Sequence, residues 1–485
     1  MMEYLLDLSA WEIAEKIAKK EVSAEVVIRT VFDRIEKTEK QIGSFVHLRK
    51  ENALKDALEV DRKIKNNEKI GALAGVPIAI KDNMVMKDER SNSSSKILNS
   101  YESIYNSTVV EKIKEADGII IGTTNMDEMA MGSSTKTSFN GVTKNPWDIQ
   151  RVPGGSSGGS ATSIAAKQVF LSLGSDTGGS IRQPASFCGV VGMKPTYGRV
   201  SRYGLMAFAS SMDQIGPFSK TVKDAAFMLN VISGKDEYDA TLSTREVPNY
   251  LDSIGKSISG MKIGIPKEYF IDGIQPGVKK IIEDSIDLIK KMGGIIVPIS
   301  LPHTKYAVAT YYVIAPAEAS SNLARYDGVR YGYRNKEATN IEELYSKSRT
   351  EGFGDEVKRR IIIGTYVLNA GYFEAYFKKA QKVRNLIKQD FDNVFETVDI
   401  IVTPVSPTTA FKLEDKKTLM ELYLEDIFTI SANLAGIPGL TVPAGLAQGL
   451  PVGIQFLAKA FDEEKLFAIG SAFELERGKF EMPIL

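Results

Sequence analysis

Histidine and cysteine are scarce in this chain. Its 485 residues include two histidines, His47 and His303, and a single cysteine, Cys188. A Ser-His-Asp or Cys-His catalytic site would have to use these residues, yet neither histidine lies in a glycine-rich, site-like segment. The pool of zinc ligands is equally small. We therefore expect neither a histidine-based hydrolase nor a metal site, and one cysteine cannot form an intramolecular disulfide.

An excess of charge and long apolar runs are also absent. Lys plus Arg and Asp plus Glu each number 61, so the formal net charge is zero, which gives this chain no electrostatic reason to bind nucleic acid by itself. No apolar run approaches the roughly 18 residues of a membrane span, and the N-terminus lacks the pattern of a secretory signal. With the single cysteine, these absences lead us to expect a cytoplasmic protein without membrane contacts.

Apolar segments of strand length alternate with amphipathic helical patterns, which predicts an α/β fold. We expect short strands at 76–80, 118–122, 261–266, 294–299 and 399–404. We expect helices at 9–20, 51–65, 108–117, 276–292 and 463–475. Ser9 followed by Glu12 fits a capping box, and a second such pattern begins at Thr108.

Two clusters of glycine and serine lie within residues 151–184. They are GGSSGGS (154–160) and GSDTGGS (174–180), and they bracket one helix-like and one strand-like segment. Because glycine lets other groups approach the backbone closely, this arrangement indicates two loops that converge on one place. Flexible linkers are a poor explanation, since linkers are not interleaved with apolar periodic segments.

Three interpretations of the two clusters remain. A phosphate-binding loop would use backbone N–H groups at a helix start, but neither cluster ends in GKS or GKT. A pair of structural tight turns is the second. The third is a serine hydrolase in which lysine replaces histidine as the base. The residues alone do not choose between Ser156 and Ser157 in the first cluster. They also do not choose between Ser175 and Ser180 in the second.

Lys81 has the context that a catalytic lysine needs. It follows the apolar segment 76–80 and precedes Asp82 and Asn83. A lysine that extends to solvent is the commoner alternative, but α/β proteins place ligand-contacting residues just beyond strand ends. Burial there would lower its pKa from about 10.4. Successive backbone N–H groups from Asp176 to Ser180 could then stabilise a developing oxyanion.

Lys81, GGSSGGS and GSDTGGSIRQPA, in this order, resemble the amidase signature family. The resemblance implies a Ser-cisSer-Lys triad in which Ser180 is the nucleophile. Ser156 would be the bridging serine, preceded by a cis peptide bond, and Lys81 would be the base. The implied oxyanion hole consists of the backbone N–H groups of Thr177, Gly178, Gly179 and Ser180.

Other segments are similar to the A subunits of tRNA-dependent amidotransferases, a branch of that family. They include NMDEMAMGSS, VVGMKPTYGRVSRYGL, EGFGDEVKRRI and NLAGIPGLTVPAG, and the similarity spans essentially the whole chain. It implies a glutaminase in a heterotrimer with the B and C subunits. Its ammonia would pass to the B subunit, which uses ATP and Mg²⁺ to activate the glutamate carried by tRNA(Gln) and binds most of the charged tRNA. This chain itself would bind no cofactor.

Two other functions are weighed against that one. The first is a stand-alone amidase acting on small amides, and the second is a catalytically silent scaffold or tRNA-binding protein. The zero net charge and the complete triad pattern speak against the second. The sequence does not decide whether Asp-tRNA(Asn) is also a substrate.

The resemblance also implies a binding site for glutamine. Arg360 would bind the α-carboxylate in a bidentate way, Asp426 would lie near the α-ammonium, and Tyr311 would line the pocket. Without the resemblance, Arg360 would be an ordinary arginine on a helix surface. Lys167 and Gln168 depart from the small residues common in the family, but they are expected to lie away from the triad.

For the fold, the resemblance implies a central mixed, twisted β-sheet covered by helices on both faces. We predict a single amidase domain over 1–485. Its parts would be N-terminal helices (1–70), a catalytic core (71–305), a mostly helical subregion over the sheet (306–395) and a return to the core sheet (396–485).

Overall fold

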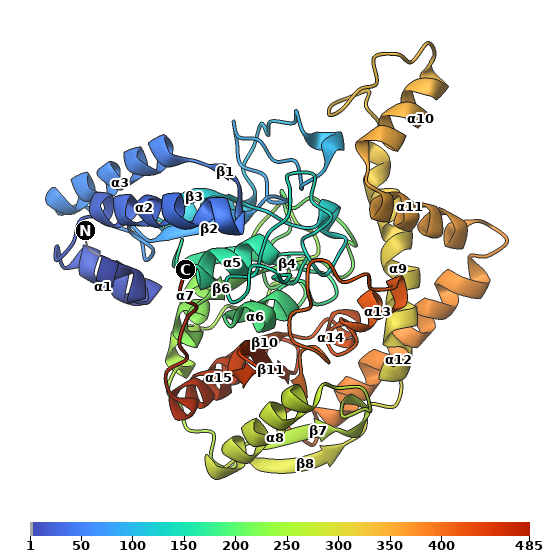
Figure 1. Cartoon of the computed structure of the whole chain (residues 1–485). Helices are drawn as coiled ribbons and strands as arrows, with labels where there is room; N and C mark the ends of the chain where they lie inside the picture. The colour runs from blue at the N-terminus through green and yellow to red at the C-terminus, as the bar shows by residue number, and fades with distance from the viewer. Residues whose placement is uncertain (1–2) are drawn as a thin grey trace.

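Eleven strands form one mixed sheet in the computed structural model, which describes residues 3–485 (Figure 1). The strand order is β1-β3-β2-β4-β6-β5-β10-β11-β9-β7-β8. The strands are β1 (Phe45–Leu48), β2 (Pro77–Lys81), β3 (Ile119–Thr124), β4 (Leu171–Asp176), β5 (Val191–Lys194), β6 (Gln214–Ser219), β7 (Lys262–Pro266), β8 (Ile295–Ile299), β9 (Ile400–Pro404), β10 (Gly439–Ala447) and β11 (Leu450–Ala458). The predicted α/β class with a mixed sheet is confirmed.

The sheet has two parallel groups joined by antiparallel strands. β2 runs parallel to β3 and β4, and β7 runs parallel to β8 and β9. In the first group Ile80 is opposite Leu173. Parallel strands end at the same edge of a sheet, where α/β proteins bind their ligands. The end of β2 at Lys81 therefore lies beside the end of β4, which leads into the second Gly/Ser cluster.

Helices surround the sheet. They are α1 (Ala10–Ala18), α2 (Ala24–Ile42), α3 (Lys50–Lys65), α4 (Thr108–Glu115), α5 (Gly158–Ala165), α6 (Arg182–Cys188), α7 (Val222–Ile232), α8 (Pro276–Lys291), α9 (Ala307–Asn322), α10 (Ile341–Gly352), α11 (Asp355–Leu368), α12 (Lys379–Val394), α13 (Leu419–Leu424), α14 (Ile430–Ala435) and α15 (Glu463–Arg477). Every residue of β2, β3, β4, β6, β9 and β11 is buried. Since successive side chains of a strand point to opposite faces, both faces of the central sheet are covered.

The stretch predicted to be mostly helical contains α9, α10, α11 and α12. No strand occurs between β8 and β9 in the part of the chain that the structure describes. These helices form the right-hand side of the molecule in Figure 1, with α10 outermost. Helix α9 packs against both α11 and α12. Within residues 3–485, no helix is both long and apolar enough to cross a bilayer.

The two predicted capping boxes have different outcomes. Ser9 and Glu12 form the reciprocal hydrogen bonds of a capping box at the start of α1, as predicted. The second prediction is wrong, because Thr108 is already the first residue of α4 and its N-cap Ser107 makes no side-chain capping bond. The Thr108 hydroxyl instead donates to the Asp236 carboxylate. The hydroxyl thus donates to a distant carboxylate and does not accept from a backbone N–H of its own helix.

Candidate active site

Lys81 ends β2 in a fully buried position surrounded by serine hydroxyls. Its Nζ lies 2.7 Å from Ser156 Oγ, 2.8 Å from Ser157 Oγ and 2.9 Å from Ser175 Oγ. Both Gly/Ser clusters therefore meet at this lysine. Burial lowers the pKa of Lys81 to about 7, and the nearby carboxylates of Asp127 and other residues oppose that shift only partly. A large fraction of this amine is neutral near pH 7 and able to accept a proton.

The three hydroxyls around Lys81 are bonded differently. Ser156 Oγ has Lys81 as its one hydrogen-bond partner among residues 3–485. Ser157 Oγ also donates to the Ser175 carbonyl oxygen (3.1 Å) and accepts from the Ser175 N–H (3.3 Å). Ser175 Oγ accepts a second hydrogen bond from Asn83 Nδ2 (3.0 Å). The Ser156 hydroxyl is thus the one of the three without a competing partner.

The loop that carries Ser156 is held by Asp127. The Gly155–Ser156 peptide bond is cis, as the resemblance implies. The Asp127 N–H donates to the Ser156 carbonyl oxygen (3.1 Å), and the Asp127 carboxylate accepts from the N–H groups of Ser134 and Thr135. A Cβ added at Gly155 would lie 2.1 Å from Asp127 Oδ2. Only glycine fits between this carboxylate and the serine loop.

Ser180 lies beside the loop that carries Ser156 and Ser157. Its carbonyl oxygen accepts from the Ser157 N–H (3.3 Å). Its side chain is partly exposed, unlike the buried Ser156, Ser157 and Ser175. The Ser180 hydroxyl makes no hydrogen bond to any residue that the structure describes. Ser180 is thus the one serine of the two clusters that is not buried, and a substrate can reach it.

Asp176 organises the loop that precedes Ser180. Its buried carboxylate accepts from the N–H groups of Gly179 (2.9 Å) and Ile181 (3.1 Å). It also pairs with the buried Arg182 guanidinium through two 3.0 Å contacts. Burial alone would raise the pKa of Asp176, but the Arg182 charge outweighs burial and lowers it to about 2. This carboxylate therefore stays ionised and fixes the loop at physiological pH.

The hydrogen bonds of Asp176 occupy one of the four expected oxyanion donors. Gly179 donates its N–H to Asp176, so that group is occupied here. The N–H groups of Thr177, Gly178 and Ser180 have no acceptor among residues 3–485. Three of the four expected donors are therefore free to bind a developing negative charge.

The three expected glutamine-binding residues come from different elements, and two of them, Tyr311 and Asp426, connect to the loop at Gly178. A Cβ added at Gly178 would lie 2.8 Å from Tyr311 Cζ, so Tyr311 of α9 packs on this loop. The Thr429 hydroxyl donates to the Gly178 carbonyl oxygen (2.6 Å), and a 3.0 Å contact joins it to the Asp426 carbonyl oxygen. The segment that holds Asp426 is thereby connected to the loop that precedes Ser180.

Arg360 is buried on α11 in an aromatic setting. Its guanidinium carbon lies 5.4 Å from the ring centre of Tyr312 and 5.5 Å from that of Phe208. Its Nε donates to Glu356 Oε1 (2.8 Å), whereas neither Nη atom bonds to any described residue. Two parallel donors on one planar group match the geometry of a carboxylate, so Arg360 is available to an anionic ligand.

The Asp426 carboxylate is also without a hydrogen bond among the described residues. Burial and the adjacent Glu425 carboxylate raise the pKa of Asp426 well above its usual range, against the effect of Arg360. A cation placed beside this carboxyl would stabilise its ionised form. Arg360 and Asp426 together therefore offer one anion-binding and one cation-binding group in the same region.

The two histidines lie elsewhere. His47 contacts Glu89 at 3.1 Å, and His303 contacts Asp390 at 2.9 Å. Among residues 3–485, no three His, Cys, Asp or Glu side chains converge in a way that could hold a metal ion.

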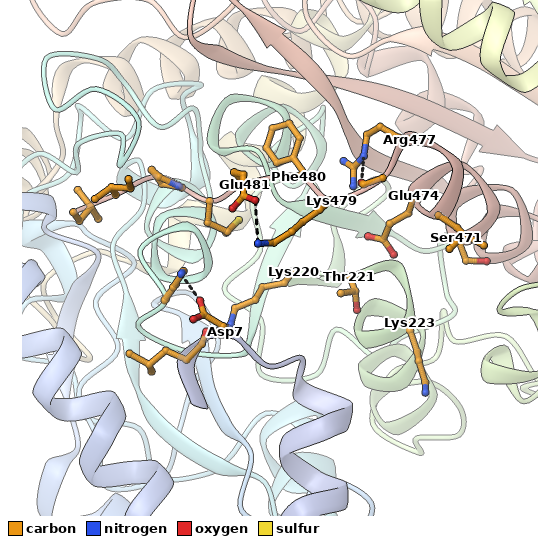
Figure 2. Close-up of a pocket in the computed structure, with 18 of the residues that line it drawn as sticks. Asp7, Lys220, Thr221, Lys223, Ser471, Glu474, Arg477, Lys479, Phe480 and Glu481 are labelled. Atoms are coloured by element: carbon orange, nitrogen blue, oxygen red, sulfur yellow. Dashed lines mark hydrogen bonds and ion pairs between the residues drawn. The ribbon is translucent and has the colours of Figure 1, made fainter. Parts of the chain in front are cut away.

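A large surface cavity of about 1220 Å³ lies between the two ends of the chain (Figure 2). Seven basic side chains line it, but many of them bind groups of the protein itself. Lys167 pairs with Asp7, and the Lys220 ammonium donates to the carbonyl oxygens of Leu6 and Leu8. None of the expected site residues borders this cavity, so its size does not mark the active site.

The sequence reasoning missed the buried carboxylates that hold the site together. Asp127 lies within the stretch TTNMDEMAMG, whose remaining residues apart from Glu128 are uncharged. An acidic residue in such surroundings is a detectable signal, because buried charges are nearly always paired or hydrogen-bonded. Thr429 gives no comparable signal, since its role depends on a contact with a residue 251 positions away.

Comparisons with known proteins identify the family of this chain. A family model described as Amidase matches residues 26–467. The chain is 63% identical over 481 residues to the A subunit of glutamyl-tRNA(Gln) amidotransferase from Fusobacterium nucleatum, with 99% of each chain covered. The A subunit of the Carboxydothermus hydrogenoformans enzyme is 58% identical, with 96% of each chain covered. The crystal structure of the Thermotoga maritima A subunit is 45% identical with a TM-score of 0.83, covering 99% of this chain and 98% of that one. The chain therefore belongs to the amidase signature family.

Proposed function

We propose that this chain is the glutaminase component of a glutamyl-tRNA(Gln) amidotransferase. It hydrolyses glutamine and supplies ammonia to a partner protein. The observation that carries the proposal is the pairing of a buried Lys–Ser relay with Arg360, whose two Nη atoms are free to bind a carboxylate. A site for simple amides needs the relay but has no use for a buried arginine. The relatives at 63% and 58% identity bear the name of this amidotransferase component.

In the proposed mechanism Ser180 is the nucleophile. Its hydroxyl attacks the carbonyl carbon of the glutamine side-chain amide and passes its proton to Ser156, while Ser156 passes its own proton to neutral Lys81. The free N–H groups of Thr177, Gly178 and Ser180 stabilise the oxyanion that forms. Loss of one such donor typically costs about 3 to 4 kcal/mol of transition-state stabilisation.

The same relay completes the reaction. As the C–N bond breaks, the relay returns the proton to the departing nitrogen, and NH₃ leaves. The γ-glutamyl ester on Ser180 remains. A water molecule then attacks this ester and gives its proton to the relay. Glutamate departs, and the Ser180 hydroxyl is restored.

Substrate recognition uses both ends of the amino acid. Arg360 binds the α-carboxylate through its two Nη atoms, Asp426 pairs with the α-ammonium, and Tyr311 forms the wall beside Gly178. Binding of the ammonium lowers the raised pKa of Asp426, since an opposite charge favours the ionised carboxylate.

A partner is part of this proposal. Ammonia released into water is mostly protonated at neutral pH and is then not a nucleophile, so it needs a protected route. We assign that role to a heterotrimer with the B and C subunits of the amidotransferase. In this complex ATP and Mg²⁺ act at the B subunit, which also binds most of the charged tRNA. We expect the complex in the cytoplasm.

The Ser180→Ala variant tests the function. Assembled with the B and C subunits, it should lose glutamine-dependent formation of Gln-tRNA(Gln) but keep the ammonia-dependent reaction. Survival of the glutamine-dependent reaction would disprove the assignment of the nucleophile.

Glutaminase activity should also be measured with and without the two partners and charged tRNA. Rapid hydrolysis of simple amides at a rate that the two partners and charged tRNA do not change would favour a stand-alone amidase.

A further inference from the structure

Glu128 is a buried carboxylate that the mechanism above does not use. It lies on the short 3-10 turn η3 (Glu128–Ala130), directly after Asp127, and its side chain is 4% exposed. Its Oε1 and Oε2 lie 3.1 and 2.9 Å from the N–H nitrogen of Gly354. The Ser95 hydroxyl donates to Oε1 as well. The partner Gly354 is 226 residues away in sequence.

Gly354 is the N-cap residue of α11, the helix that carries Arg360. The first N–H groups of a helix lack partners within the helix, and its N-terminus favours negative charge. Glycine has no side chain to cap them, and α11 has no side-chain capping bond of its own. Glu128 supplies the missing acceptor from another part of the fold. A Cβ at position 354 would lie 2.3 Å from Glu128 Oε2, so a larger residue there would displace this carboxylate.

Asp127, the preceding residue, contacts the other half of the site. It binds the Ser156 carbonyl oxygen through its N–H group. The two residues that follow Glu128 hold the turn in an unusual shape, since Met129 (φ 52°) and Ala130 (φ 60°) are both left-handed. Non-glycine residues rarely adopt this conformation, and where they do the surrounding structure enforces it. One strained turn therefore joins the serine relay to the start of the Arg360 helix.

We propose that Glu128 is a positioning residue that sets Arg360 at the correct distance from the catalytic serines for a substrate with an α-carboxylate. This inference rests on the proposed glutaminase function. Asp127 and Glu128 act as a two-residue brace, with one residue bound to the Ser156 loop and the next to α11. Glu128 itself touches neither substrate nor reacting atoms.

The test compares two substrates in the complex with the B and C subunits. Glutamine carries the α-carboxylate, whereas 4-aminobutanamide has the same amide and amine without it. Burial raises the pKa of Glu128 to about 7, so the assays are run above that pH, where it is ionised. Loss of the cap in Glu128→Ala should raise KM for glutamine about tenfold and change kcat less than about twofold. The kcat/KM for 4-aminobutanamide should stay within about twofold of the wild-type value.

Two further variants separate positioning from folding. Glu128→Gln keeps an acceptor for the Gly354 N–H and should restore most of the affinity for glutamine. Glu39→Ala is the matched control, because Glu39 also accepts a backbone N–H (Phe45, 2.8 Å) but lies away from α11. It should leave KM for both substrates unchanged.

A double-mutant cycle completes the experiment. In an Arg360→Ala background, Glu128→Ala should have no additional effect on kcat/KM for glutamine. Equal losses on both substrates, or effects that add to those of Arg360→Ala, would overturn the positioning role while leaving the function intact. A wild-type complex without glutaminase activity would instead overturn the proposed function, and this inference with it.

Discussion

The surroundings of Lys81 and of Arg360 differ in how fully their polar groups are bonded. Lys81 has three hydroxyl oxygens within 2.9 Å, and the loops around it are fixed by Asp127 and Asp176. Arg360 has one hydrogen bond to protein and two free Nη atoms among aromatic rings, within the part of the chain that the structure describes. The polar groups around Lys81 are hydrogen-bonded without substrate, whereas Arg360 has donors that are free to bind a charged ligand. This difference indicates that chemistry and substrate choice are separable in this protein.

The largest difference in kcat is expected between substitutions of two neighbouring serines that both contact Lys81. Ser156→Ala removes the proposed proton relay and should lower kcat by about 10⁴-fold. Ser157→Ala removes a hydroxyl that is also bonded to Ser175 and should lower kcat by only about tenfold. Steady-state glutaminase assays of both variants provide the measurement. Equal losses would mean that the two hydroxyls share the relay and that the assignment of Ser156 is wrong.

A smaller but selective effect is expected at Arg360. Arg360→Ala removes a charge-assisted bidentate pair, so kcat/KM for glutamine should fall by about 10² to 10³-fold. Hydrolysis of 4-aminobutanamide should change little. Lys358→Ala, on a more exposed side of the same helix, is the control and should behave as wild type. A comparable loss on both substrates would show that the two regions are not separable.

The pH dependence should follow Lys81. Its pKa is lowered to about 7 by burial, and the neutral amine is the active form. The kcat should therefore rise through about pH 7 to a plateau, falling about tenfold per unit below that value. A flat profile between about pH 6 and about pH 8 would contradict a lysine base with this pKa.

Parts of this picture were predictable from the sequence because they depend on local patterns. Lys81 follows an apolar strand segment, and both Gly/Ser clusters stand out by composition. The main parallel strands were found for the same reason. By contrast β1, β5 and β6 were not predicted, since β1 and β5 have only four residues and β6 has glycine, proline and polar residues between its apolar ones.

The rest depended on contacts between residues distant in sequence. The choice between Ser156 and Ser157 rests on what else each hydroxyl binds, which no spacing reveals. The failed capping prediction at Thr108 has the same origin, because Asp236 competes for its hydroxyl. The cap on α11 joins residues 226 positions apart. Of these long-range acceptors only Glu128 leaves a weak local trace, because it and Asp127 lie in an otherwise uncharged stretch.

The most direct test is to identify the serine that carries the γ-glutamyl ester. Wild-type complex is quenched in acid during glutamine turnover, and its peptides are mapped by mass spectrometry. The account predicts a γ-glutamyl ester on Ser180, and its absence in the Ser180→Ala variant. An ester on Ser156 or Ser175, or turnover that proceeds in Ser180→Ala, would contradict it.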